Sequence, residues 1–226
     1  SVNKKSPVPV PRSLPLTENP GVFSFFFRLK MGNIFGSIMF EVQGHRLAIL
    51  VACDINPDGL ESLKKEITEA GHSVRTYVCD ITDAASLTRL FQEVDSDVPQ
   101  LDILVNNAGI VLGKNFLDLT IEDFRKTMEV NFFGHLRFTK HFLPLMVERN
   151  SGHIVNIASS AGLQGFPGAA DYNASKFAEV GLTEALRLEL KKLKCYGVKT
   201  TLVCPYVIDT GMFHGFKPLL LNPILK

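Results

Sequence analysis

A continuous apolar run at residues 47–53, Leu-Ala-Ile-Leu-Val-Ala-Cys, constrains the fold of this 226-residue chain more than any other feature. It lacks polar alternation, which is typical of a strand covered on both faces. Further strand-like stretches lie at residues 74–79, 102–105, 153–158 and 200–204, separated by helical patterns at about residues 58–70, 83–94, 120–149 and 172–193. This alternation predicts an α/β domain with right-handed crossovers and a Rossmann-like, doubly wound parallel sheet.

The chain divides into a short arm and one domain. Residues 1–21 carry five prolines without periodicity, which predicts an extended or disordered arm; a proline-rich ligand for a partner domain is the alternative. Residues 22–226 are expected to form a single domain. Their apolar content fits that expectation, since 46% of the whole chain is hydrophobic and 21% is charged, as in proteins with a full core.

The net charge and the cysteines limit which partners, metal sites and cellular locations are expected. A formal net charge of +1 gives no electrostatic reason to expect nucleic acid. The four cysteines lack metal-ligand spacing, so we expect no metal site, reduced thiols and a cytosol-facing location. Residues 22–40 are apolar but interrupted by Arg28 and Lys30. They predict either an interfacial helix at a membrane surface or a buried first strand plus helix, and not a spanning helix.

Tyr172 and Lys176 are the first candidates for chemistry. Four residues make just over one helical turn, so the phenol and the ammonium share a helix face. A neighbouring cation favours the phenolate, which makes a tyrosine usable as a general acid or base. Taken alone, the same spacing usually indicates an ordinary amphipathic helix.

Three upstream motifs complete a specific pattern. Asn106-Asn107-Ala108-Gly109 follows one strand-like stretch, Asn131 lies inside the long helical pattern, and Ser159 follows another strand thirteen residues before Tyr172. In this order the motifs closely resemble those of the short-chain dehydrogenase/reductase family, over about residues 45–213. The resemblance implies a catalytic set, with Tyr172 as general acid/base, Lys176 stabilising the phenolate, Ser159 binding the substrate oxygen and Asn131 holding a water of a proton relay. A buried structural asparagine is the alternative for Asn131.

The cofactor is expected to bind beyond the carboxyl ends of the strands. Asp54 ends the strand at residues 47–53, where a carboxylate can accept hydrogen bonds from ribose hydroxyls and repel a 2′-phosphate, so NAD is expected rather than NADP. A helix-capping role before Pro57 is the alternative. The resemblance places Asp80 and Ile81 at the adenine edge, although Asp80 also suits a turn. The remaining positions that it implies for the cofactor are Asn107, Ala108, Gly109, Tyr172, Lys176, Pro205, Val207 and Thr210.

Both ends of the chain depart from the family's pattern. Counting back from Asp54 places the family's glycine loop, T-G-x-x-x-G-x-G, on residues 29–36. Gly32 and Gly36 match and are expected to bind the cofactor, but Lys30 and Ile34 replace the two glycines that the tight turn and the pyrophosphate require. Relatives also continue beyond the point where this chain stops. We therefore expect an altered first strand and glycine loop, and a domain truncated at its C-terminus without the last strand.

Within the family, Cys53-Asp54-Ile55-Asn56-Pro57 and Thr210-Gly211-Met212-Phe213 are most similar to the branch of retinol dehydrogenases and 17-beta-hydroxysteroid dehydrogenases. This implies hydride transfer between a lipophilic alcohol, retinol or a steroid, and its carbonyl. It also implies a homodimer at the endoplasmic reticulum membrane or lipid droplets, facing the cytosol, with a cytoplasmic enzyme as the alternative. A catalytically impaired relative that acts as a membrane or lipid-droplet binding protein is the competing hypothesis.

Overall fold

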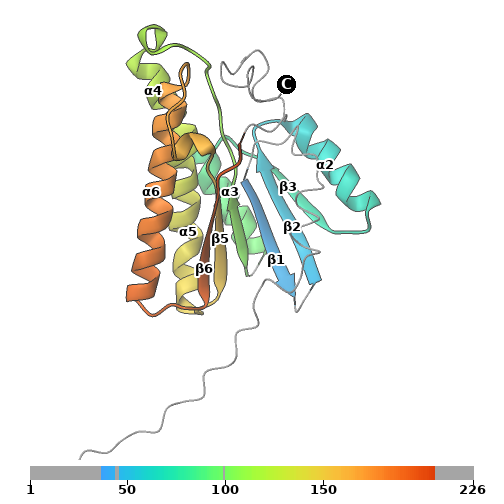
Figure 1. Cartoon of the computed structure of the whole chain (residues 1–226). Coiled ribbons are helices and arrows are strands. Elements are labelled where there is room, and N and C mark those ends of the chain that lie inside the picture. The colour runs from blue at the N-terminus through green and yellow to red at the C-terminus, as the bar shows by residue number, and fades with distance from the viewer. Residues whose placement is uncertain (1–36, 44–45, 99, 207–226) are drawn as a thin grey trace, which may run out of the picture.

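A computed structural model describes residues 37–43, 46–98 and 100–206. They form one six-stranded sheet in the order β3-β2-β1-β4-β5-β6 (Figure 1). The strands are β1 (Ser37–Gln43), β2 (Arg46–Asp54), β3 (Val74–Val78), β4 (Ile103–Asn106), β5 (Gly152–Ile157) and β6 (Val198–Val203). The helices are α2 (Pro57–Glu69), α3 (Ala84–Asp97), α4 (Ile121–Met128), α5 (His135–Glu148) and α6 (Ala170–Lys192), with short segments η2 (Phe116–Asp118), η3 (Glu129–Gly134) and η4 (Ser160–Gly162). The predicted α/β architecture is confirmed.

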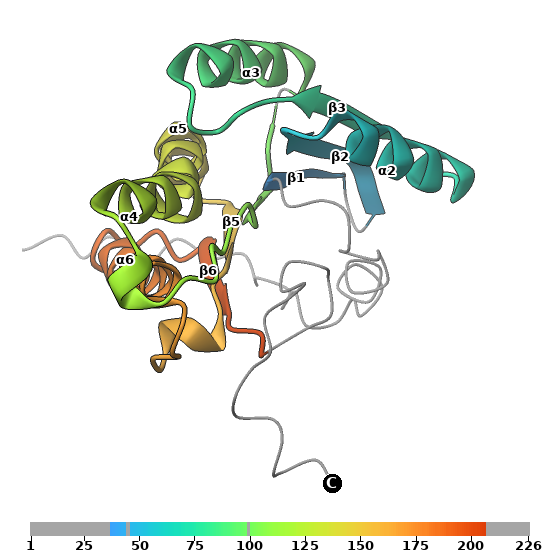
Figure 2. The same ribbon diagram turned by 90° about the horizontal axis from the view of Figure 1, so that it is seen from above.

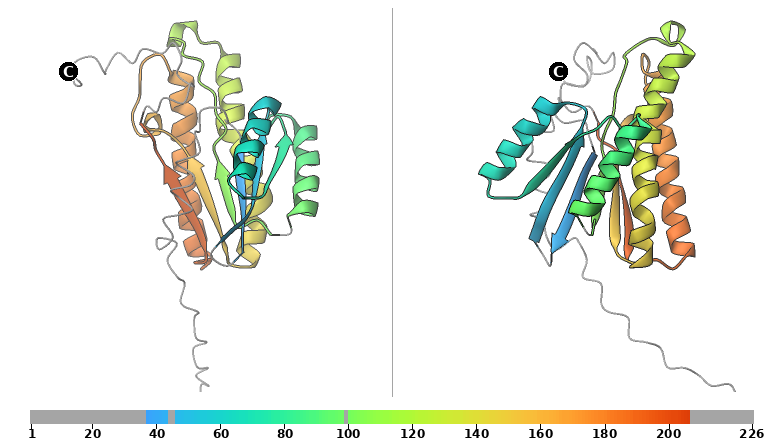
Figure 3. Two further views of the ribbon diagram at one scale, coloured as in Figure 1. Left: turned by 90° about the vertical axis from the view of Figure 1, so that its right-hand side faces the viewer. Right: turned by 180° about the vertical axis from the view of Figure 1, so that it is seen from behind.

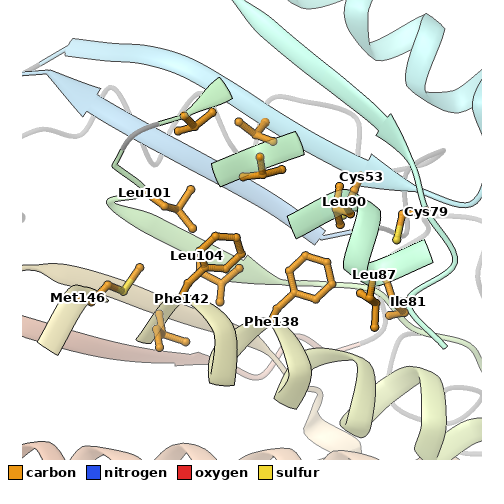
Figure 4. Close-up of a cluster of buried hydrophobic side chains, with 14 of the residues drawn as sticks. Cys53, Cys79, Ile81, Leu87, Leu90, Leu101, Leu104, Phe138, Phe142 and Met146 are labelled. Atoms are coloured by element: carbon orange, nitrogen blue, oxygen red, sulfur yellow. The ribbon is translucent and has the colours of Figure 1, made fainter. Parts of the chain in front are cut away.

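Helices cover the two faces of the sheet unequally. The helices α3, α5 and α6 lie on one face, whereas α2 lies on the other (Figures 2 and 3). The larger core fills the first face, where Phe138 and Phe142 of α5 pack against Leu104 of β4 and the apolar side of α3 (Figure 4). A smaller core joins α2 to Leu50 and Ala52 of β2. Residues 50–53 of the run at residues 47–53 are therefore buried from both sides, as the lack of alternation predicted.

The parallel strands bring their carboxyl ends to one edge of the sheet. β2 pairs in parallel with β3, β4 with β5, and β5 with β6. Asp54 ends β2, Asn106 ends β4, and Ser159 follows the end of β5. Segments far apart in the sequence thus supply side chains to the same edge, where open α/β sheets bind their ligands.

The first strand departs from the parallel expectation. β1 runs antiparallel to both of its neighbours, with Ser37 opposite Cys53 of β2 and Ile38 opposite Val105 of β4. Only residues 44–45 separate β1 from β2, and so short a connection can join adjacent strands only in antiparallel fashion. A parallel pair would need a crossover of about a dozen residues or more.

This reversal corrects the predicted order of first strand and glycine loop. The strand at the central position follows Gly36 in the chain, whereas the family pattern places the strand before the glycines. The loop and helix that would join the first strand to the second have no counterpart between β1 and β2. Gly32 and Gly36 themselves lie outside the described residues, as do the predicted arm at residues 1–21 and, near the other end, Val207 and Thr210.

The long helix expected at residues 120–149 is three consecutive segments. α4 passes into the π-helical segment η3, which contains Asn131, and the chain continues as α5. Widened π turns are rare and occur often at functional sites. The interruption therefore falls at the residue that the sequence pattern singled out in this helix.

The start of α4 yields a prediction about acid stability. Thr120 and Asp123 form a reciprocal capping box, and Lys114 Nζ lies 3.0 Å from Asp123 Oδ2. The backbone N–H of Thr120 and the Lys114 ammonium lower the pKa of Asp123 to about 2. A lowered folded-state pKa contributes stability above the unfolded value, and this contribution is lost as the pH falls from about 4 to about 2.

We expect Asp123→Asn to lower Tm near pH 6 by about 2–4 °C, and by less at pH 3, in differential scanning calorimetry. The matched control is Glu122→Gln, which removes an exposed carboxylate of the same helical turn. An equal loss at both pH values would show that the charge of Asp123 contributes nothing.

Candidate active site

The predicted pair Tyr172 and Lys176 lies buried near the start of α6. Tyr172 is 5% exposed and Lys176 is 3% exposed. The Lys176 ammonium lies 5.8 Å from the centroid of the Tyr172 ring. The ring packs in a small apolar cluster with Ala161 and Ala169. A buried ammonium beside a buried phenol differs from the exposed pair that an ordinary amphipathic helix would give, because burial strengthens their electrostatic interaction.

Lys176 is held by the end of β5 and by a residue of its own helix. Its Nζ donates to the backbone oxygen of Ile157 at 2.8 Å and to Glu179 Oε2 at 2.9 Å. The first bond joins α6 to the strand that leads to Ser159. The second involves a carboxylate that sequence reasoning missed, although the i, i+3 spacing would have placed it on the face of Lys176.

Ser159 lies in the tight turn between β5 and α6. Its Oγ accepts a hydrogen bond from Ala161 N at 3.1 Å, at the start of η4. Gly162 allows this turn to approach α6, since a Cβ there would lie 2.7 Å from the backbone oxygen of Lys176. The glycine thereby keeps the serine turn against the helix that carries Tyr172, a role that the sequence pattern did not reveal.

Asn131 joins three elements by its side-chain amide. Its Oδ1 accepts from Ile110 N at 2.8 Å, and its Nδ2 donates to Ile110 O at 3.0 Å and to Ser175 Oγ at 3.0 Å. The amide is fully buried. These contacts hold the segment after Asn107-Ala108-Gly109 against α6. They are those expected of a buried structural asparagine, and the role of Asn131 in a proton relay stays a prediction.

A second buried polar chain, also missed, ties the central strands to the helices. Asn106 at the end of β4 donates to Asn156 Oδ1 of β5 at 2.7 Å and to Thr139 of α5 at 3.1 Å. Asn156 in turn donates to Thr183 of α6 at 2.7 Å. Unsatisfied buried amides are costly, so these bonds fix the relative positions of β4, β5, α5 and α6.

A pocket opens at the carboxyl ends of β2, β3 and β4. It has a volume of about 320 Å³, and its lining includes five of the residues predicted to bind the cofactor: Asp54, Asp80, Ile81, Ala108 and Gly109. Asp54 is almost fully buried and accepts from Asn56 N at 2.8 Å. The Asp80 carboxylate accepts from Thr82, which fits the turn role as well. Ile55, Lys126, Glu129 and Val130 also line the pocket and were not predicted.

The other predicted cofactor positions are only partly described. The backbone oxygen of Pro205 accepts from Ser160 N at 2.8 Å, which ties the segment after β6 to the serine turn. Asn107 lies half-buried at the end of β4. Within the described ranges, no cluster of His, Cys, Asp and Glu could hold a metal ion, and no helix is long and apolar enough to cross a membrane.

The family model for short chain dehydrogenases matches residues 40–218, which is most of the chain. This chain belongs to the short-chain dehydrogenase family. The predicted family is thereby confirmed, and the sequence relatives described next support the retinol dehydrogenase branch as well.

Epidermal retinol dehydrogenase 2 of Homo sapiens is 47% identical over 183 residues, covering 79% of this chain and 59% of its own length. Retinol dehydrogenase 10-B of Danio rerio is 48% identical over 144 residues, covering 64% of this chain and 43% of its own length. The chain thus spans only about half the length of the curated relatives that it matches.

Solved structures agree with this assignment. NAD⁺-bound xylitol dehydrogenase matches with a TM-score of 0.67 and 29% identity, covering 74% of this chain and 64% of the other. A metagenomic short-chain oxidoreductase in complex with NADP matches with a TM-score of 0.63 and 28% identity, covering 69% of each chain. Family members of this fold therefore bind either nicotinamide dinucleotide.

Proposed function

We propose that this chain is a nicotinamide-dependent oxidoreductase that interconverts a lipophilic alcohol and its carbonyl, with Tyr172 as general acid/base. The observation that carries the proposal is the buried ammonium of Lys176 beside the Tyr172 ring, held at the end of β5 next to the serine turn. Retinol is the preferred substrate candidate because several similar proteins are named retinol dehydrogenases, and a steroid alcohol is the second.

The described residues fit the adenosine half of a dinucleotide. The pocket beyond β2–β4 combines a buried carboxylate, Asp54, with the apolar side chain of Ile81 and the small residues Ala108 and Gly109. A ribose can donate its hydroxyl hydrogens to such a carboxylate, and small residues allow a flat ring to approach the backbone. The hydride acceptor for alcohol oxidation, or its donor for carbonyl reduction, would be the nicotinamide of the bound cofactor.

Side chains of this protein then transfer the proton of the substrate hydroxyl. In the oxidative direction the Tyr172 phenolate takes the proton of the alcohol, and in the reductive direction the phenol returns it. The Lys176 ammonium stabilises the phenolate, and Ser159 donates a hydrogen bond to the substrate oxygen, where charge develops. Burial of Tyr172 and Lys176 keeps water from screening the interaction between them.

The carboxylate of Asp54 predicts the choice between NAD and NADP. Its charge would repel a 2′-phosphate, so NAD is expected to bind more tightly. Asp54→Asn keeps an oxygen that can accept from Asn56 N while removing the charge. We expect the ratio of the NADP and NAD dissociation constants to fall by at least about tenfold, which is about 1.4 kcal/mol, in isothermal titration calorimetry.

The matched control is Asp58→Asn, in the exposed first turn of α2. An unchanged ratio in Asp54→Asn would leave Asp54 with only its turn-forming role.

The second candidate is a catalytically impaired relative that binds membranes or lipid droplets, and the reversal of β1 supports its impaired catalysis. The family holds the cofactor's pyrophosphate with the loop and helix after its first strand. No such helix fits in the two residues between β1 and β2. A chain that retains only the adenosine half of the site would bind NAD no better than adenosine.

One experiment decides between the two. NADH formation with retinol and with a steroid alcohol is measured for this chain and for a restored version in which the family's first strand, glycine loop and helix replace the residues before β2. Thermal shifts with NAD and with adenosine are recorded in parallel. Activity in both chains supports the dehydrogenase. Activity in the restored chain alone, with equal shifts for NAD and adenosine in the present one, supports the impaired relative.

We also propose that the chain acts as a homodimer at the endoplasmic reticulum membrane or lipid droplets, facing the cytosol. The long helices α5 and α6 lie side by side at the surface, and they expose Leu145, Phe177 and Leu188 (Figure 1). Exposed apolar side chains on two adjacent helices suit a helix-to-helix interface. Light scattering on the purified chain would report the dimer, and a purely monomeric mass would exclude it. Fractionation of cells expressing the chain would report its location.

A further inference from the structure

A buried chain of charges runs behind Lys176, on three residues from two helices. Lys176 Nζ donates to Glu179 Oε2 at 2.9 Å, and the other oxygen, Glu179 Oε1, lies 2.8 Å from His135 Nδ1. The side chains of Glu179 and His135 are 2% and 3% exposed. His135 is the first residue of α5, so the carboxylate connects the two long helices directly behind the proposed general acid/base.

The contacts of Glu179 favour the ionised form of its carboxylate. Burial alone would raise the pKa of Glu179, but the nearby charges of Lys176 and His135, with their hydrogen bonds, outweigh burial and hold the pKa below its ordinary value. An ionised carboxylate only accepts hydrogen bonds, so His135 Nδ1 must carry a hydrogen and donate it. His135 therefore fixes the orientation of the carboxylate that faces the lysine.

The contacts of Lys176 limit what its ammonium can do for Tyr172. An ammonium has three N–H donors. The backbone oxygen of Ile157 takes one and Glu179 takes a second. Within the described part of the chain, one donor is left for the side of the ammonium toward Tyr172. The same carboxylate also places a negative charge next to the positive one, so it offsets part of the field that stabilises the phenolate.

The other titratable groups around this part of α6 do not supply a second negative charge to the Lys176 ammonium. Asp171 of α6 accepts from the uncharged Thr127 of α4, and Glu129 of η3 pairs with Arg137. Cys204, after β6, has a raised pKa because it is partly buried and because the carboxylate of Glu179 lies near, so its thiol stays neutral near neutral pH. The segment η4 consists of serine, alanine and glycine.

We propose that Glu179, oriented by His135, is a positioning residue that fixes the Lys176 ammonium and reduces the net positive charge facing Tyr172. The assignment rests on the proposed function in that Tyr172 and Lys176 form the reacting pair. Glu179 thereby sets the pH at which Tyr172 ionises, and with it the pH range in which Tyr172 can act as a base.

The test follows the ionisation of Tyr172 directly by ¹³Cζ-tyrosine NMR, which needs neither cofactor nor turnover. The Tyr172 signal is assigned by its loss in Tyr172→Phe. In Glu179→Gln the amide keeps an oxygen for Lys176 and loses the charge. We expect Tyr172 to ionise about one pH unit lower than in the unmodified chain, because a negative charge a few ångströms from the ammonium is removed.

Two further variants separate charge from structure. Glu184→Gln, on the same helix, removes the carboxylate of an exposed i, i+3 ion pair with Arg187 and is expected to leave the Tyr172 titration unchanged. Glu179→Asp keeps the charge and shortens the side chain, so it is expected to titrate close to the unmodified chain. It also provides the comparison if Glu179→Gln does not fold. A Tyr172 titration that is the same with Glu, Gln and Asp at position 179, or that moves equally in Gln and Asp, overturns the proposal.

The outcomes distinguish this inference from the proposed function. If the Tyr172 titration moves as expected but the chain forms no NADH, the electrostatic role of Glu179 is supported and the proposed dehydrogenase function is contradicted. If the chain forms NADH but the Tyr172 titration does not move, the dehydrogenase function is supported and the role of Glu179 is contradicted. In an active chain, the acidic limb of the pH profile for alcohol oxidation should move in Glu179→Gln in the same direction as the NMR titration.

Discussion

Tyr172→Phe is expected to lower the rate of alcohol oxidation by ~10²–10⁴ while leaving the fold intact. The variant keeps the ring that packs with Ala161 and Ala169 and removes only the hydroxyl. Without it, the ring at position 172 has no oxygen that can accept the proton of the alcohol. Single-turnover formation of NADH measures the loss. Thermal unfolding, followed by circular dichroism, should show a Tm close to that of the unmodified chain.

The control for this experiment is Tyr196→Phe, the same chemical change at an exposed position after α6. It is expected to retain full activity. If Tyr172→Phe were as active as Tyr196→Phe, the general acid/base would have to be another group. A Tyr172→Phe chain that loses both activity and folded structure would leave the hydroxyl with a structural role instead.

The helical and strand patterns predicted most of the fold because each element is consistent with its own local sequence. The run at residues 47–53 reads as a doubly covered strand, and its residues 50–53 are buried by α2 on one side and by the larger core on the other. The motif residues were equally predictable in their placement. Asn131, Ser159, Tyr172 and Lys176 come from different elements, yet all lie at or near the carboxyl edge of the sheet, where strand order directs them.

The reversed first strand could not be predicted by matching the family's spacing. Counting back from Asp54 assumes that the first strand precedes the glycine loop, and here the central strand is Ser37–Gln43. The signal that could have revealed the reversal is the short distance between Ser37–Gln43 and Arg46–Asp54, since residues 44–45 leave room only for a hairpin. The pairing of Glu179 could not be predicted from the sequence for another reason. Its partner His135 is 44 residues away, and only the packing of α5 on α6 brings the two together.

Lys176→Met is expected to destabilise the protein by about 3–5 kcal/mol, because it breaks a buried ion pair by removing one partner. Methionine fills much of the volume of the lysine stem, so the loss of packing is small. The Glu179 carboxylate remains buried, with His135 as its hydrogen-bond partner and without the ammonium. Urea unfolding near pH 7.5 measures the loss, provided that the slope m is unchanged.

The double variant Lys176→Met with Glu179→Gln tests whether the carboxylate's charge causes this cost. Glutamine is neutral and still offers an oxygen to the hydrogen of His135 Nδ1. We expect the double variant to be more stable than Lys176→Met alone, with a coupling of about 0.5–3 kcal/mol between the two positions. Arg187→Met with Glu184→Gln is the exposed counterpart on the same helix, where solvent screens the pair and the coupling should be much smaller than at positions 176 and 179.

The pH dependence of the destabilisation in Lys176→Met distinguishes the charge of Glu179 from the packing of Lys176 as its cause. In the unmodified chain the pKa of Glu179 is lowered, so the pair's contribution is present above the unfolded value, ~4.3, and is lost as the pH falls through the folded value. In Lys176→Met, burial is no longer outweighed by the ammonium, so we expect the carboxyl to take up a proton more readily when folded. The destabilisation should then shrink between pH 7.5 and pH 5. The opposite outcome is a destabilisation that is equal at both pH values and persists in the double variant. The packing of Lys176 and its bond to Ile157 would then explain the lost stability, and Glu179 would have no electrostatic role.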